Sequence, residues 1–149
     1  METAEQKIVS TLQELTQFIN DGHKGYEHAA KETTNPQLRQ LYQTLAGQRA
    51  EFAQELNEII KNHGGTAQTS TTTKGKIFRQ WIDAKAALTN RDDNNILSSN
   101  LYGEEWAQKA YNNALQQPDL PQPIRQLVER QKLALEQTYQ TLQKLKDAD

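Results

Sequence analysis

Cysteine is missing from the chain, which excludes disulfide bonds, thiolate metal ligands and cysteine nucleophiles. Long apolar runs are missing as well, so no segment has the about 18 apolar residues that a membrane-spanning helix needs. The formal net charge is only −2 and lysine and arginine form no runs, so the basic surface of a nucleic-acid-binding protein is not expected. The first residues are acidic and do not resemble a signal peptide. We therefore expect a cytoplasmic protein that binds neither nucleic acid nor membrane.

Glycine and proline are scarce, with seven and four residues among 149, and they gather at a few points. Between these points the chain is rich in Gln, Ala, Leu, Glu and Lys, which all favour helices. Glycine and proline that cluster in this way are typical of the ends of long helices. The length suits one domain with a core of its own.

The first half of the chain predicts a helical hairpin over residues 3–63. In its first helix, small and apolar residues recur at alternating spacings of four and three, which places them on one face. Asn35-Pro36 is typical of a helix start, and Gly64-Gly65 of a helix end. The residues expected to face inward are Ile8, Leu12, Leu15, Ile19, Gly22, Tyr26 and Ala29, then Leu38, Leu41, Leu45, Phe52, Leu56 and Ile59.

A second hairpin is predicted over residues 92–147, with its corner at Pro118, Pro121 and Pro123 and its first helix running to about 117. Residues 64–91 connect the two hairpins; we expect a mobile stretch over 66–74 and a short helix over 75–88 that carries Trp81. The predicted fold is one domain, an all-α antiparallel four-helix bundle with an extra short helix in the connection. The inward residues of the second hairpin are Ile96, Leu97, Leu101, Tyr111, Leu115, Ile124, Val128, Leu135, Leu142 and Leu145.

Polar residues interrupt the apolar faces near the middle of the helices. They are Asp21, Arg49, Glu104 and Gln131. A buried charge needs a partner, so Arg49 should pair with a carboxylate such as Asp21 or Glu104. Three interpretations remain open. The residues could form a polar core layer that fixes helix register, or they could form a ligand or metal site. Alternatively, they are exposed, and the inward face of each helix is one position away from the face expected here.

A metal site is one kind of chemistry that a helical bundle can hold in its core. Di-iron bundles use Glu-x-x-His pairs, but none of the three histidines here has Glu three residues before it. If a metal binds, the candidate ligands are Glu27, Glu51, Glu55 and Glu104, with His23 one helical turn before Glu27. Neither a nucleophilic serine elbow nor a glycine-rich phosphate loop is present.

Four segments resemble a known family. They are DGHKGYEHAA at 21–30, QRAEFAQEL at 48–56, FRQWIDAK at 78–85 and GEE at 103–105. Together they resemble an uncharacterised group of bacterial ferritin-like four-helix-bundle proteins, described only as a domain of unknown function. The resemblance implies a ferritin-like fold and no particular activity. Leu101-Tyr102 stands where this family often has an acidic residue, which removes a possible metal ligand.

The sequence thus favours a non-enzymatic interaction or stress-associated protein without a cofactor. We expect it to form a homo-oligomer and to bind a protein partner. One alternative is a carboxylate-rich protein that binds or oxidises iron or manganese. A second alternative is a small-ligand binder that uses a pocket near Trp81.

Overall fold

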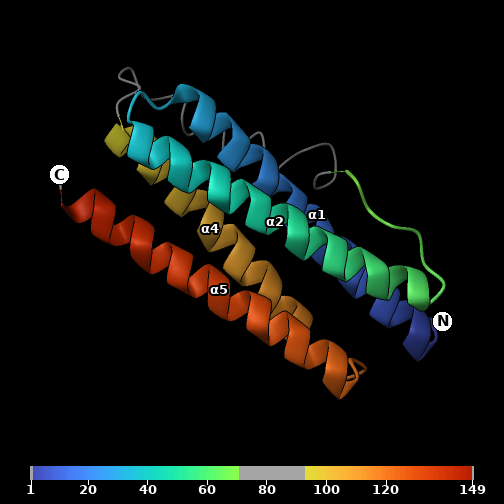
Figure 1. The fold of residues 1–149 in the computed structure, drawn as a ribbon. Coiled ribbons are helices and arrows are strands. Elements are labelled where there is room, and N and C mark those ends of the chain that lie inside the picture. Colours follow the sequence, from blue (N-terminus) through green and yellow to red (C-terminus); the bar gives the residue numbers. More distant parts are fainter. Residues whose placement is uncertain (1, 71–92, 149) are drawn as a thin grey trace.

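Four helices make up the part of the chain that the computed structural model describes, residues 2–70 and 93–148. They are α1 (Ala4–Glu32), α2 (Pro36–Asn62), α4 (Asp93–Leu115) and α5 (Gln122–Asp147). Figure 1 shows them side by side as an elongated bundle, with α1 and α2 forming one hairpin and α4 and α5 the other. The predicted all-α four-helix bundle is confirmed. The predicted short helix over 75–88, with Trp81, lies outside the described residues.

None of these helices is long and apolar enough to cross a membrane, as judged over the described ranges. Their boundaries follow local rules. At the start of α1, the Thr3 side chain and the Gln6 side chain each bond the other's backbone N–H, which forms a capping box. At the start of α2, Asn35 Oδ1 accepts hydrogen bonds from the N–H groups of Gln37 and Leu38. The predicted start of α2 is therefore confirmed, whereas α4 ends at Leu115, slightly before the expected position.

An arginine closes the corner of each hairpin. Arg39 donates to the backbone carbonyls of Ala30 and Thr33, at 3.2 and 2.7 Å. Arg125 donates to the carbonyls of Leu115 and Gln117, at 2.6 and 2.8 Å. In both cases the second helix of a hairpin supplies a cation to the carbonyls at the end of the first, where the helix dipole favours positive charge. Neither contact was predicted from the sequence.

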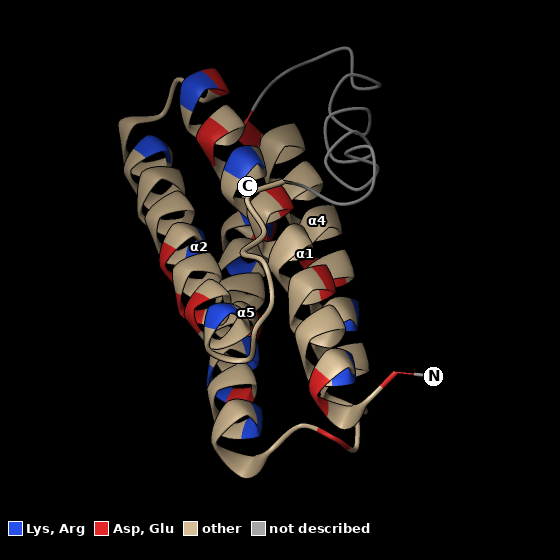
Figure 2. Ribbon diagram, turned by 90° about the vertical axis from the view of Figure 1, so that its right-hand side faces the viewer, with Lys and Arg blue, Asp and Glu red and all other residues tan. Residues whose placement is uncertain are grey.

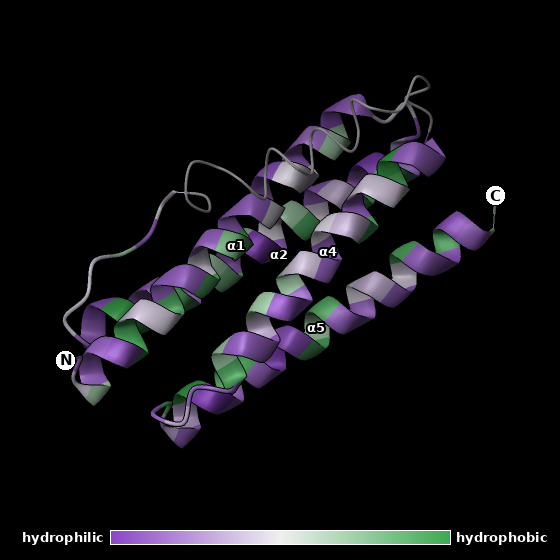
Figure 3. Cartoon of the chain, turned by 180° about the vertical axis from the view of Figure 1, so that it is seen from behind, coloured by the Kyte–Doolittle hydropathy of each residue, from purple (hydrophilic) through white to green (hydrophobic). Residues whose placement is uncertain are grey.

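The apolar faces of the helices turn inward, as Figure 3 shows by the green positions between neighbouring ribbons. All seven predicted inward residues of α1 are buried. In α2 the prediction was partly wrong, because Tyr42 and Ile60 are fully buried. Leu41 and Ile59, predicted instead, pack only against the edge of the core. Periodicity cannot choose between two adjacent apolar positions, and the packing of α2 selects the second of each pair. The remaining predicted positions that are only partly buried are Leu38, Leu115 and Leu145.

Residues 66–70, which we call the strap, run back along the hairpin after α2 ends (Figure 1). A mobile connection was expected here, but the strap is hydrogen-bonded to both helices. Asn57 Nδ2 donates to the Gln68 carbonyl, and Asn57 Oδ1 accepts from the Gln68 N–H, at 3.1 and 2.8 Å. From α1, Asn20 Nδ2 reaches the carbonyls of Gln68 and Ser70. These polar side chains satisfy backbone groups that would otherwise need water.

Gly65 is the turn position where a side chain fits least. A Cβ atom there would lie 2.5 Å from Val9 Cγ1 and 2.9 Å from Ile60 Cγ2. We expect Gly65→Ala to lower the free energy of unfolding by about 1–3 kcal/mol, because the packed core must shift to admit the methyl group. Urea denaturation followed by circular dichroism measures this. The matched control is Gly47→Ala in α2, where no atom lies within 4 Å and where we expect stabilisation by up to about 1 kcal/mol. Equal effects of the two substitutions would contradict the prediction.

Candidate functional site: a buried ion pair in the bundle core

Arg49 and Glu104 form an ion pair in the centre of the bundle, between α2 and α4. Their Nη1 and Oε2 atoms are 2.9 Å apart, and the side chains are 1% and 0% exposed. Tyr26 from α1 donates its hydroxyl to the same Glu104 oxygen. The Arg49 guanidinium also lies over the Tyr26 ring, 5.4 Å from its centroid. Three helices thus meet at one carboxylate.

Arg49 passes close to Gly22 on α1. A Cβ atom at Gly22 would lie 3.6 Å from Arg49 Nη1, so the arginine side chain passes directly beside the helix backbone. Arg49 Nε adds a hydrogen bond to the neighbouring Gln48 side chain at 3.3 Å. Arg49 therefore crosses α1 at a glycine in the core-facing row of that helix.

Burial and charge together set the protonation of the cluster. Burial lowers the pKa of Arg49, but Glu104, Tyr26 and Tyr111 together raise it by more, so the pKa lies above the ordinary value and the guanidinium stays charged. Burial raises the pKa of the Tyr26 phenol well above its ordinary value, and the negative charge of Glu104 raises it further. At neutral pH Tyr26 is accordingly a neutral hydrogen-bond donor.

A second polar chain crosses the bundle beside the ion pair and reaches the surface. The Tyr111 hydroxyl donates to Gln131 Oε1 at 2.6 Å, and Gln131 Nε2 donates to Glu55 Oε1 at 3.0 Å. The other Glu55 oxygen accepts from Arg130 at 2.7 Å, outside the core. Gln131 therefore links α4, α5 and α2 through one amide, which restricts how these helices can slide against one another.

The sequence predicted four members of a polar layer, and the structure places all four in the core. Arg49 pairs with Glu104, and Gln131 lies in the neighbouring chain of hydrogen bonds. Asp21 is buried in α1, but Arg49 does not form its ion pair with it. The two hydroxyl groups of Tyr26 and Tyr111 were missed, because tyrosine in an apolar row was counted as an apolar residue. A tyrosine in a row that also carries buried charges was the available signal.

The candidate metal ligands do not converge. His23 and Glu27 lie on α1 with Nε2 and Oε1 3.6 Å apart. Glu51 is exposed on α2, and Glu55 is held by Arg130 and Gln131. Glu104 accepts from Arg49 and Tyr26. Within residues 2–70 and 93–148, no three His, Asp or Glu side chains come together as a metal-binding group.

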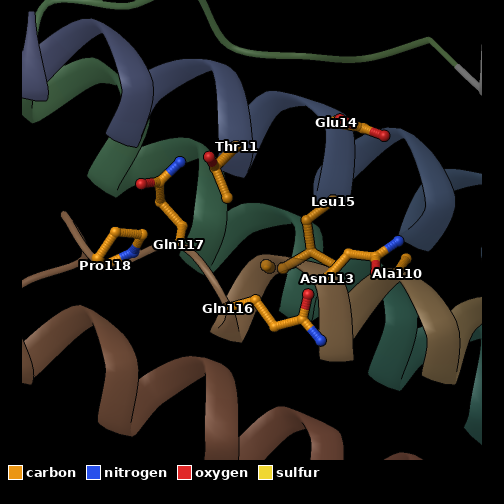
Figure 4. A pocket seen from close by; sticks show the side chains of 9 residues that line it. Thr11, Glu14, Leu15, Ala110, Asn113, Gln116, Gln117 and Pro118 are labelled. Carbon is orange, nitrogen blue, oxygen red and sulfur yellow. The ribbon is translucent and has the colours of Figure 1, made fainter.

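The surface clefts lie away from the ion pair. The one in Figure 4, of about 240 Å³, lies between α1 and α4 near the second corner. Leu15, Ala110 and Ala114 contribute its apolar side, and Thr11, Glu14 and Asn113 surround it with polar groups. It does not include any member of the buried cluster. The ion pair is therefore closed to ligands on this side of the bundle.

Comparison with solved structures shows the class to which this architecture belongs. A mutant of Mycobacterium smegmatis Dps1 matches with a TM-score of 0.81 and 15% identity, over 98% of this chain and 99% of that one. A ferritin-like, diiron-carboxylate protein from Bacillus anthracis str. Ames matches with a TM-score of 0.75 and 17% identity, over the same shares. The fold is thus a ferritin-like four-helix bundle.

The sequence itself identifies the family. The family described as a domain of unknown function (DUF2383) matches residues 7–117, and the chain belongs to it. This confirms the resemblance drawn from the sequence motifs. No curated protein matches the chain.

Proposed function

We propose that this chain is a non-enzymatic interaction protein that uses a ferritin-like bundle as a rigid, metal-independent scaffold. The observation that carries the proposal is the contact of Arg49 with Glu104 at 2.9 Å in the core. A solved relative in fold is described as a diiron-carboxylate protein, so the same core could in principle hold iron. In this chain the buried carboxylate of Glu104 is instead neutralised by a fixed guanidinium.

The donor set does not fit a di-metal centre. Carboxylates hold hard cations when their oxygens are available, but Glu104 Oε2 already accepts from Arg49 and Tyr26, which leaves only Oε1 without a hydrogen-bond partner among the described atoms. The permanent charge of Arg49 would repel a divalent cation placed beside it. The other candidate carboxylates, Glu27 and Glu51, are exposed on the outer faces of α1 and α2. The function must then reside on the surface of the bundle. We further propose that the chain self-associates and is cytoplasmic.

Metal analysis of the purified protein tests this proposal. After incubation with Fe(II) under air and removal of free iron, we expect no stoichiometric iron or manganese. We also expect the thermal unfolding midpoint to be the same with and without EDTA, because no bound metal contributes to stability. Iron at one or more equivalents per chain, lost in a Glu104→Gln variant, would overturn the proposal. It would show that the core carboxylate is available as a ligand.

A further inference from the structure

The groove between α1 and α2 on the outer side of the first hairpin consists of two clefts in a row, and His23 borders both. The first cleft, of about 400 Å³, lies between Asn20 on α1 and Asn57 on α2 and is bordered by Gln68 of the strap. The second, of about 500 Å³, lies beyond His23 towards the corner of the hairpin; no residue of the strap lines it, and we call it the open half of the groove. Its floor is formed by Ala30 and Ala46, and Gly47 borders it.

The strap shows what kind of ligand this groove accepts. It is a non-helical stretch of polypeptide, and side-chain amides from both helices bind its backbone. Asn57 bonds both the N–H and the carbonyl of Gln68, and Asn20 donates to two carbonyls. Gln13 donates to the Thr66 carbonyl in the same way. A peptide backbone is thus bound at the border of the first cleft by side chains of both helices.

The open half carries positive charge. Arg39 is fixed there by its bonds to the carbonyls of Ala30 and Thr33, and its remaining N–H groups stay available. The Lys31 ammonium also borders the cleft and forms no ion pair within the described ranges. The one carboxylate of the cleft, Glu27, lies beside His23. Figure 2 shows that residues of both charge signs occur along the helices.

Gly47 leaves space beside α2 at the border of this cleft. It lies in the interior of α2, where glycine costs about 1 kcal/mol relative to alanine. Within the described fold nothing requires it, because a Cβ atom there would meet no atom within 4 Å. A glycine of this kind permits close approach of another backbone from outside.

From the bound strap, the adjoining open cleft and its charges, we propose that the open half of the groove binds an acidic, non-helical segment of a partner protein. The proposal rests on the interaction function above and names its surface and the chemistry of its partner. Backbone groups of the segment would meet Gln43 and His23, and its carboxylates would meet Lys31 and Arg39. The chain's own residues 71–92 match this surface poorly in sequence, since they carry five Lys and Arg against two Asp.

Fluorescence anisotropy with a labelled peptide of about eight residues, alternating glutamate and serine, tests the proposal, since such a peptide spans about 26 Å when extended. We expect the purified full chain to bind this peptide at low salt. We expect no binding of a peptide of the same length that alternates lysine and serine. Gly47→Glu should weaken binding at least about tenfold, because it fills the cleft and adds a negative charge. The matched control is Leu133→Glu, which adds the same charge at an exposed position of α5 and should bind like the parent chain.

Three outcomes would overturn the proposal. They are equal binding of the acidic and basic peptides, unchanged binding by Gly47→Glu with a normal circular dichroism spectrum, and full competition by free glutamate at the same charge concentration. The last would identify a small-anion site instead. Each is distinguishable from failure of the scaffold proposal, because that proposal is decided by iron content, which the peptide assay does not measure.

Discussion

Replacing Arg49 with methionine is expected to lower the free energy of unfolding by about 3–5 kcal/mol. Removing one partner of a buried ion pair leaves the other charge without compensation in a medium that solvates it poorly. Here the remaining charge is that of Glu104, which is 0% exposed and would retain only the Tyr26 hydroxyl as a donor. Urea denaturation monitored by circular dichroism gives the change directly.

A matched exposed pair provides the control. Arg130 and Glu55 lie 2.7 Å apart, but their side chains are 58% and 36% exposed. Arg130→Met should cost less than about 1 kcal/mol, because water screens that pair. If both substitutions cost the same small amount, the core pair is accessible to water and the assigned burial is wrong.

The double substitution Arg49→Met with Glu104→Leu should recover most of the lost stability. Buried ion pairs are often replaceable by apolar residues of similar volume, since both desolvation costs vanish together. The pair here is not bidentate: Arg49 Nη2 and Glu104 Oε1 have no hydrogen-bond partner among the described atoms. A double variant as unstable as the single one would instead mean that the charges themselves hold the helices in register.

Alkaline pH should unfold the protein through its buried tyrosines. Burial raises the pKa of Tyr26, Tyr42 and Tyr111 in the folded state. For Tyr111, the nearby Arg49 charge opposes this rise without cancelling it. In the unfolded chain each phenol ionises near its ordinary pKa of about 10. The contribution to stability is therefore complete below about pH 10 and is lost as pH rises above it, because only the unfolded state releases the protons.

The expected loss is about 1.4 kcal/mol per pH unit for each of the three phenols, once pH exceeds about 10. Unfolding free energies measured in urea from about pH 9 to pH 11 provide the slope. Tyr42→Phe should reduce the dependence of the unfolding free energy on pH by the contribution of one phenol. The ultraviolet absorbance of the folded protein should show no ionisation of these three residues before the unfolding transition. A free energy of unfolding that stays constant over this pH range would contradict the burial of the three tyrosines.

The sequence was sufficient for the helices, the corners and the positions of the polar layer, because each depends on local rules. Arg49, Glu104 and Gln131 interrupt apolar rows, so a polar layer could be proposed from their spacing, whereas their burial is shown only by the structure. The choice of Glu104 over Asp21 as the partner of Arg49 could not be predicted from the sequence. It depends on how far α4 is rotated and shifted against α2, which is set by contacts between hairpins rather than within them.

The hydrogen bonds of the buried tyrosines could not be predicted for a related reason. Tyr26 and Tyr111 satisfy the apolar pattern with their rings, while their hydroxyls bind partners on other helices. A hydrophobic pattern reports only that a side chain faces inward, and it does not report where its polar end points. The contacts of the strap were not predictable either, because Asn20 and Asn57 are ordinary polar helix residues until a backbone lies beside them.

The two arginine clamps at the corners also bear on the order in which the molecule assembles. Arg39 and Arg125 bond carbonyls only six to ten residues away. The hydroxyl of Tyr26 meets Glu104 across 78 residues. Closing a short loop costs less entropy than closing a long one, so each hairpin can form early and separately. We then expect the charges in the core to meet last, so that this step joins two finished halves and sets the rate that stopped-flow refolding would record.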